Sequence, residues 1–239
     1  MLADDVYPVE LPFSFLTHNR PMPRHFDLIC IDWDGTLSDS TAAIVRAIQC
    51  AVRDVGGHEP EAADAAWVIG MALGPALRRV APNIAPEQYP LLADRYRHHY
   101  AQLAAQVLLF GGVREMLAEL RARGHLLAVA TGKSRAGLDA ALRQSQLAAS
   151  FDATRTAEEC AGKPNPQMLH ELMEELGATP ARTLMVGDTS HDMDMAQRAG
   201  CAAVAVSYGA HEADGLRAFA PRFVAPSVAA LRQWLQEHA

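Results

Sequence analysis

Short runs of apolar residues alternate along the chain with longer stretches in which apolar residues recur every three to four positions. The short runs are typical of buried strands, and the longer stretches are typical of amphipathic helices. The predicted strands are 27–31, 126–130, 183–186, 201–206 and 223–224, and the helices predicted between them are 113–123, 134–146, 166–176 and 192–199. Because alternating strands and helices form a parallel sheet covered on both faces, we expect a doubly wound, Rossmann-like α/β fold.

The stretch 40–109 departs from this alternation, since it contains helical patterns only. We expect four helices there, at 41–56, 61–70, 75–81 and 86–106. Such an insert is best interpreted as a small second domain that lies over the sheet. The predicted organisation is an α/β core (24–39 and 110–239), an inserted helical domain (40–109) and an extended arm (1–23) that has four prolines and no periodic pattern.

Composition and charge limit the partners and the compartment. The 21 Lys and Arg residues against 28 Asp and Glu give a net charge of −7, which disfavours nucleic acids and anionic membranes as partners. Half of the residues are hydrophobic, so disorder is excluded as the dominant state, and no apolar run approaches the ~20 residues of a membrane helix. The four cysteines form no closely spaced pair, and the acidic first residues do not resemble a secretory signal, so we expect a cytoplasmic protein.

Polar residues follow three of the predicted strands. Asp32 and Asp34 follow the first strand, Thr131-Gly132-Lys133 follows the second, and Asp188 to Asp192 follows the third. Lys163-Pro164 adds a further cation from a loop. Because open parallel sheets place their sites at the carboxyl ends of strands, we expect these groups to converge at one edge of the sheet.

The chemistry that these residue types favour is phosphoryl transfer. Asp32, Asp34 and Asp188 would repel one another unless a cation lay among them, and a hard ion with oxygen ligands such as Mg²⁺ suits that demand. A carboxylate held beside such an ion can attack phosphorus and form an aspartyl-phosphate. Thr131, the backbone N–H groups after Gly132 and the Lys163 ammonium are the candidate donors to the phosphoryl oxygens.

Four ordered motifs carry a family resemblance. They are Asp32-x-Asp34-x-Thr36, Thr131-Gly132, Lys163-Pro164 and Gly187-Asp188-x-x-x-Asp192. Together they resemble the motifs of the haloacid dehalogenase superfamily over roughly residues 25 to 235. The helical insert after the first motif is similar to the α-helical cap of the branch that includes phosphoglycolate phosphatase.

The resemblance implies a role for each residue of the first motif. Asp32 would be the nucleophile and a metal ligand. Asp34 would protonate the leaving oxygen and then activate water, and its backbone carbonyl would also bind the metal. The second aspartate favours phosphate esters as substrates, since branches that cleave carbon–halogen or carbon–phosphorus bonds lack it.

The later motifs would hold the phosphoryl group and the metal. Thr131, Gly132 and Lys163 would bind the phosphoryl group, with Lys163 also steadying Asp32. Asp188 would bind Mg²⁺ directly, and Asp192 would support it.

Each of these residues also has a plain structural interpretation. Asp34 and Thr36 are common turn residues beside a glycine, Lys163 alone suggests a solvated loop lysine, and Asp192 alone suggests a helix cap. Gly70 is the one candidate from the insert: related caps bring a glycine-containing loop to the leaving group, and the alternative is a simple turn between helices.

Other polar residues near the motifs are given no catalytic role. His191 is expected at the rim of the site, the His98-His99 pair on a solvated helix face, and Asp194 on the outward side of its helix.

The function expected from the sequence is hydrolysis of small phosphomonoesters by a Mg²⁺-dependent phosphatase of the phosphoglycolate phosphatase type, with a small phosphorylated metabolite as its partner. Two alternatives remain open at this point. One is a mutase that resembles β-phosphoglucomutase and passes the phosphoryl group to a second sugar hydroxyl, and the other is a non-catalytic binding module on the same fold. The oligomeric state is not indicated by the sequence.

Overall fold

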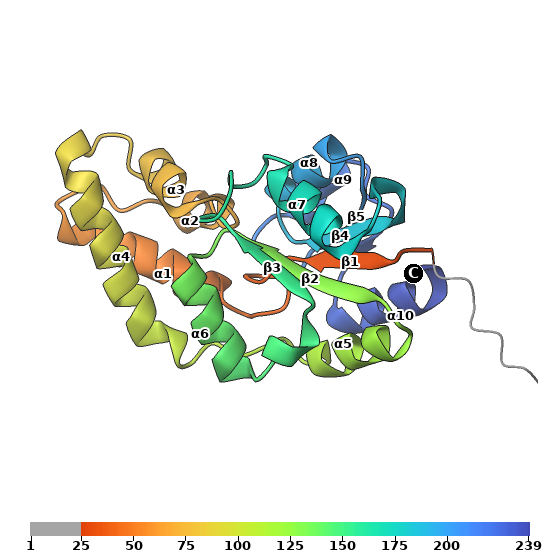
Figure 1. Ribbon diagram of the computed structural model, residues 1–239. Helices are drawn as coiled ribbons and strands as arrows, with labels where there is room; N and C mark the ends of the chain where they lie inside the picture. The colour runs from red at the N-terminus through yellow and green to blue at the C-terminus, as the bar shows by residue number, and fades with distance from the viewer. Residues whose placement is uncertain (1–24) are drawn as a thin grey trace, which may run out of the picture.

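The computed structural model describes residues 25–239, so the predicted arm lies outside the described residues. Six parallel strands form one sheet in the order β3-β2-β1-β4-β5-β6 (Figure 1). The strands are β1 (Leu28–Ile31), β2 (Leu126–Thr131), β3 (Ala153–Thr156), β4 (Thr183–Gly187), β5 (Ala202–Val206) and β6 (Val224–Ala225). From β1, the strands β2 and β3 follow outward on one side and β4, β5 and β6 on the other, which is the doubly wound α/β topology predicted from the sequence.

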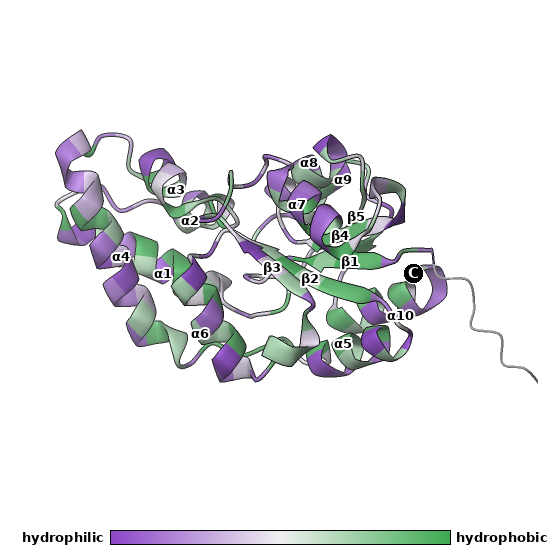
Figure 2. Ribbon diagram, viewed as in Figure 1, coloured by the Kyte–Doolittle hydropathy of each residue, from purple (hydrophilic) through white to green (hydrophobic). Residues whose placement is uncertain are grey.

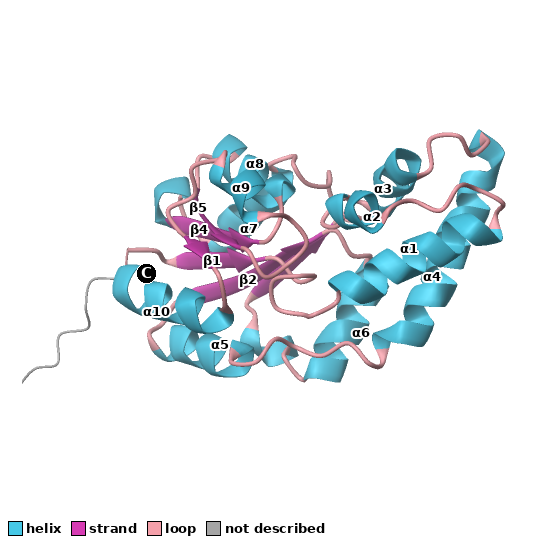
Figure 3. Cartoon of the chain, turned by 180° about the vertical axis from the view of Figure 1, so that it is seen from behind, coloured by secondary structure: helices cyan, strands magenta, loops and turns pink. Residues whose placement is uncertain are grey.

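Helices cover both faces of the sheet. They are α5 (Val113–Ala122), α6 (Arg135–Ser145), α7 (Gln167–Leu176), α8 (Ser190–Arg198), α9 (Ala213–Arg217) and α10 (Val228–His238). Figure 3 shows α7, α8 and α9 on one side of the sheet and α5 and α10 on the other. The central strands are apolar on both faces because both faces are covered, and Figure 2 shows them as a hydrophobic band between the helices.

The two faces of the sheet have different cores. On the face of α5, α6 and α10, branched residues of the strands such as Ile29, Val129 and Val186 pack against leucines of the helices. On the face of α7 and α8, smaller residues such as Cys30 and Ala128 meet a methionine-rich layer. Alternate residues of each strand therefore serve opposite cores, as the period of two along a strand requires.

The chain between β1 and β2 is helical, as predicted. It contains α1 (Thr41–Asp54), α2 (Ala62–Trp67), α3 (Leu73–Val80) and α4 (Tyr89–Ala104), with a short 3₁₀ helix at Pro86–Gln88. Two further 3₁₀ helices of the described chain lie after β2, at Ala148–Ser150 and Pro180–Arg182. These four helices have a hydrophobic cluster of their own, in which Ile44, Ile48 and Val52 of α1 pack against residues of the other three. Figure 1 shows the insert beside the carboxyl-terminal ends of the strands.

Both connections between the insert and the core run side by side. Ser38 and Leu109 form an antiparallel bridge, the Asp39 amide donates to the Leu108 carbonyl at 2.9 Å, and the Phe110 amide donates to the Leu37 carbonyl at 3.0 Å. The insert therefore leaves and rejoins the core at one place.

The apolar pattern does not predict three of the described elements, which are β3, α9 and α10. β3 has the sequence Ala-Thr-Arg-Thr and is an edge strand, so it has no apolar run. In α10 the buried residues Val228, Leu231 and Leu235 are spaced three and four positions apart. This spacing is typical of an amphipathic helix and is the sequence pattern from which α10 can be predicted. None of the helices described for residues 25–239 has the length and apolar content of a membrane span.

Candidate active site

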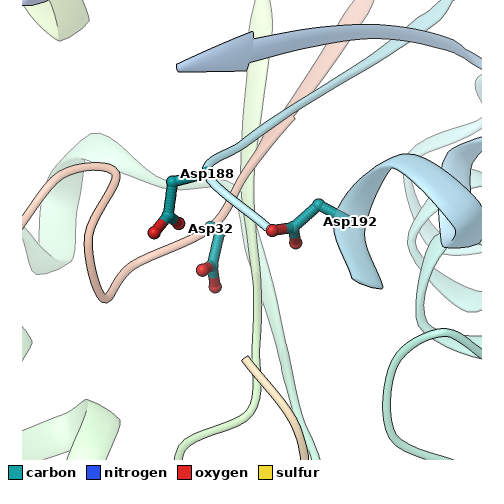
Figure 4. Close-up of side chains that lie close together, drawn as sticks. All are labelled: Asp32, Asp188 and Asp192. Atoms are coloured by element: carbon teal, nitrogen blue, oxygen red, sulfur yellow. The ribbon is translucent and has the colours of Figure 1, made fainter. Parts of the chain in front are cut away.

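Three aspartates converge where β1 and β4 end, at the point where the strand order reverses. Asp32 follows β1, Asp188 follows β4, and Asp192 lies in the first turn of α8 (Figure 4). Carboxylate oxygens of the three lie within 4.8 Å of one another, and all three residues are buried. The structure thus brings together three residues that the sequence places up to 160 positions apart.

Asp188 is oriented by two hydrogen bonds. The Thr36 hydroxyl donates to its Oδ1 at 2.8 Å and the Ala210 amide donates to its Oδ2 at 2.7 Å. Gly35 and Gly209 lie so close to this carboxyl group that a Cβ on either would overlap it. The loops after β1 and β5 therefore enclose Asp188, and Gly35, at φ +77°, also has a backbone conformation that favours glycine.

Asp192 is held by a capping box at the start of α8. Its Oδ2 accepts from the Thr189 amide at 3.1 Å and from the Thr189 hydroxyl at 2.7 Å, and the Asp192 amide in turn points to the Thr189 hydroxyl. Asp192 can therefore cap α8 and belong to the candidate site at the same time, because its other oxygen, Oδ1, lies beside Lys163 of the cluster. Asp194 pairs with Arg198 at 2.7 Å instead.

Lys163 is the cation of the cluster. Its Nζ lies 2.7 Å from Asp32 Oδ1 and 2.6 Å from Asp192 Oδ1, and its side chain is completely buried. Burial by itself lowers the pKa of Lys163, but the charges of Asp192 and Asp32 outweigh burial and leave the pKa above its ordinary value. Lys163 is therefore a charged group inside the site, not a solvated loop lysine.

One ammonium does not balance three carboxylates. Burial, followed by the charge of Asp192 and opposed by Lys163, raises the pKa of Asp32. Burial and the charges of Asp32 and Asp192 raise that of Asp188 well above its ordinary value. Asp32 Oδ2 accepts no hydrogen bond from any described residue. A buried set of oxygen ligands with excess negative charge and an unpartnered oxygen suits a hard divalent cation such as Mg²⁺, so the cluster could hold a metal ion.

Asp34 lies apart from this cluster. Its carboxylate accepts from Lys133 Nζ at 2.8 and 3.0 Å and from the Ser40 hydroxyl at 2.7 Å. The expectation that Asp34 contributes to a metal site therefore concerns its main-chain carbonyl only, and it stays a prediction. The sequence places Lys133 among the strand-end residues, but nothing in the motif order indicates that it would pair with Asp34.

The loop after β2 lies directly beneath the helical insert. Thr131 is fully buried at the end of β2, and a Cβ on Gly132 would lie 2.5 Å from the Gly70 carbonyl oxygen and 2.6 Å from that of Met71. Gly70, at φ +89°, thus brings the insert's backbone against the candidate phosphate-binding loop. The expected approach of Gly70 to a substrate's leaving group stays a prediction.

Two histidines of the core hold the same carbonyl of the insert. His191 Nε2 lies 3.0 Å and His211 Nε2 2.9 Å from the Trp67 carbonyl oxygen, and since a carbonyl only accepts, both nitrogens carry the proton. The Trp67 ring stacks on His211, and Arg79 lies over Trp67, 3.7 Å from the ring centroid. His191 is therefore buried between insert and core rather than placed at an exposed rim. The sequence offers no signal for His211, which is far from the motifs.

A cavity of about 960 Å³ lies between the insert and the core. Asp34, Gly132 and Lys133 border it from the core, and Gly70 and residues of α1, α3 and α4 border it from the insert. Asp34 and Gly132 thus border a partly open space that is large enough for a small organic molecule.

Comparisons with known proteins identify the family of the chain. The family described as haloacid dehalogenase-like hydrolase matches residues 29–206. "Probable phosphatase IndB" of Dickeya dadantii (strain 3937) is 37% identical over 202 residues, which cover 82% of this chain and 88% of that protein. "Phosphoglycolate phosphatase" of Vibrio vulnificus (strain CMCP6) is 34% identical over 218 residues, which cover 87% of this chain and 95% of that protein.

A solved structure shows the same fold. The crystal structure of a predicted phosphoglycolate phosphatase from Haemophilus somnus 129pt superposes with a TM-score of 0.79 at 24% identity, covering 89% of this chain and 99% of that one. The sheet order and the helical insert after β1 fit the family match. The chain therefore belongs to the haloacid dehalogenase-like hydrolase family, among relatives that are named phosphatases.

Proposed function

We propose that the chain is a Mg²⁺-dependent phosphatase that hydrolyses small phosphomonoesters through an aspartyl-phosphate on Asp32, in the manner of the phosphoglycolate phosphatase-like branch. The observation that carries this proposal is the surroundings of Asp32. One of its oxygens is held by Lys163, and the other is unpartnered within the described chain and lies in a cluster of acidic ligands. Such a carboxylate is positioned as a nucleophile.

Asp32 and Asp188 would hold the metal directly, with the Asp34 carbonyl as a further ligand and Asp192 in support. When bound, Mg²⁺ would offset the negative charge of the cluster and of the phosphoryl oxygens. The donor set fits this ion, because it consists of carboxylate oxygens that the protein itself does not neutralise.

The remaining steps of phosphoryl transfer are assigned to residues of the chain itself. An Asp32 oxygen attacks phosphorus while Lys163, the Thr131 hydroxyl and the N–H groups after Gly132 donate to the phosphoryl oxygens. Asp34, held by Lys133 and Ser40, protonates the departing oxygen and then takes a proton from the water that hydrolyses the phospho-aspartate. The close approach of the Gly70 and Met71 carbonyl oxygens to Gly132 supports a place for the insert beside the phosphate-binding loop.

Small phosphorylated metabolites are the proposed partners, and phosphoglycolate is the named compound to test first, since a relative carries that name. The net charge of −7 argues against nucleic acid and anionic membranes. Four widely spaced cysteines favour a cytoplasmic location.

The test is a phosphate-release screen over many phosphorylated metabolites, run with Mg²⁺ and again with a chelator. We expect release that needs Mg²⁺ and that the Asp32→Asn variant loses. Isomerisation of a sugar phosphate that needs a sugar bisphosphate and releases no inorganic phosphate would favour a mutase instead. An absence of turnover over the whole panel would favour a binding protein.

A further inference from the structure

The wall of the cavity above Asp34 is apolar. Its lining from the insert includes Ile44, Ile48, Leu73, Leu77, Tyr96 and Tyr100. The two tyrosine rings lie nearly parallel, with centroids 5.9 Å apart and planes inclined by 14°. Flat aromatic surface and aliphatic side chains face the space into which the leaving group of a phosphomonoester at Asp32 would project.

The cavity offers little to an anionic leaving group. Lys133 is the cation nearest Asp34, and its three N–H groups are already directed to the two Asp34 oxygens and the Tyr100 hydroxyl. Arg97 and Arg114 also border the cavity, but both are exposed, so water screens their charge. Glu158, another bordering residue, adds negative charge. Among the described lining residues there is thus no buried cation free to bind a second carboxylate.

The volume points the same way. A two-carbon leaving group such as glycolate would fill only a small part of this partly open cavity of 960 Å³ and would leave the apolar side chains of the insert in contact with water. Filling that space with apolar groups removes surface from water, and each methylene buried is worth about a fourfold gain in affinity.

We propose that the substrate's leaving group is uncharged, largely apolar, and at least the size of an aromatic ring, and that it lies against α3, α4 and the tyrosine pair. This rests on the proposed phosphatase function. The reaction is unchanged: the P–O bond to the alcohol breaks, the alcohol oxygen takes up a proton, and water supplies the oxygen that completes inorganic phosphate.

A substrate series that keeps the leaving group a primary alcohol isolates this effect. Ethyl, butyl, hexyl and 2-phenylethyl phosphate are compared with phosphoglycolate by kcat/KM. We expect a rise of about fourfold per added methylene. We also expect 2-phenylethyl phosphate to exceed phosphoglycolate by about tenfold or more. A flat alkyl series, or phosphoglycolate as the best substrate, would overturn the proposal while leaving the phosphatase function intact.

A charge placed on the wall gives the matched test. Leu73→Arg introduces a cation into the cavity, whereas Leu91→Arg makes the same change at an exposed position of α4 that does not line it. We expect Leu73→Arg to lower kcat/KM for 2-phenylethyl phosphate by about tenfold and to raise it for phosphoglycolate, with Leu91→Arg changing neither by more than about twofold. Melting temperatures check that both variants fold. Equal effects of the two variants would contradict the proposal.

Binding separates this proposal from the proposed function. In the Asp32→Asn protein, isothermal titration calorimetry measures the Kd of 2-phenylethyl phosphate and of phosphoglycolate without turnover. We expect the first Kd to be about tenfold lower, even if the wild-type protein hydrolysed no phosphomonoester. The reverse order would overturn the leaving-group assignment.

Discussion

The Lys133 ammonium pairs with both oxygens of the Asp34 carboxylate, at 2.8 and 3.0 Å, and it also contacts the Tyr100 hydroxyl of the insert at 3.1 Å. Both side chains of the pair are nine-tenths buried. Burial acts to lower the pKa of Lys133, but the charge of Asp34 offsets it and the pKa lies above its ordinary value. One lysine thus fixes the proposed acid–base group and joins it to the insert.

Lys133→Met should reduce both stability and turnover. A buried carboxylate that loses its only cationic partner typically costs about 3–5 kcal/mol in the free energy of unfolding. We expect kcat to fall by about tenfold or more, because Asp34 is no longer held in one orientation. Urea unfolding and steady-state kinetics measure the two effects. Lys133→Arg keeps the charge and should recover part of the stability, so equal losses in the two variants would contradict the pairing.

Asp32→Asn and Asp34→Asn should stop the reaction at different steps. Asp32→Asn removes the proposed nucleophile, so turnover should vanish and no phosphoenzyme should form. Asp34→Asn keeps the nucleophile, and turnover should fall by about 10²- to 10⁴-fold. With p-nitrophenyl phosphate, whose phenolate leaves without a proton, Asp34→Asn should still release a burst of p-nitrophenol and accumulate phospho-Asp32, detectable by mass spectrometry. Equal residual rates with no trapped intermediate would mean that water attacks directly.

Asp188→Asn should weaken the response to Mg²⁺. The amide replaces a charged ligand by a neutral group, and a lost ligand typically costs about tenfold or more in metal affinity. Mg²⁺ titrations of activity and of melting temperature both report this change. Asp194→Asn is the matched control, because Asp194 pairs with Arg198 outside the cluster. A chelator that leaves wild-type turnover unchanged would contradict the metal assignment.

The stability that Mg²⁺ confers should grow as the pH rises. Burial raises the pKa of Asp32 to about 7, from an ordinary value of about 4. Between these values the metal-free folded protein holds more protons than the unfolded chain, so its stability falls as pH increases through that window. Mg²⁺ displaces those protons, and the melting-temperature difference with and without Mg²⁺ should therefore increase from pH 5 to pH 8. A constant difference over this range would count against the buried cluster as the binding site.

Gly132→Ala should push the backbone of the insert away from the loop after β2 and lower activity. The added methyl group would meet the carbonyl oxygens of Gly70 and Met71 at 2.5 and 2.6 Å, where backbone must move. A misplacement of about 1 Å at a catalytic site can cost about 10²-fold, so we expect kcat/KM to fall by roughly that factor. Gly215→Ala, where an added Cβ meets nothing within 4 Å, is the control. Wild-type kinetics for Gly132→Ala would contradict the close approach.

The sequence predicts the sheet, and the edge of the sheet where the candidate site lies, because both predictions depend on short stretches of the sequence. Each central strand is an apolar run, and the polar residue after it marks the strand end, so Asp32, Thr131 and Asp188 can be assigned from spacing and motif order. Lys133 with Tyr100, and His211 with Trp67, are different, since each pair joins the core to the insert. Their contacts depend on how the insert rests on the core, and no periodicity encodes that. β3 is missed because this edge strand has the sequence Ala-Thr-Arg-Thr, in which three consecutive residues are polar.

The bridge between Ser38 and Leu109 has a consequence for how such proteins diversify. Because the chain departs from the sheet and returns to it at the same point, the strand order is independent of the length and shape of the intervening polypeptide. Mutation or replacement of that polypeptide can alter which molecules are admitted while the aspartates at the strand ends keep their positions. The aspartates and the insert's part of the cavity wall thus belong to separate stretches of the chain, which touch at Tyr100 and at the turn of Gly70 and Met71.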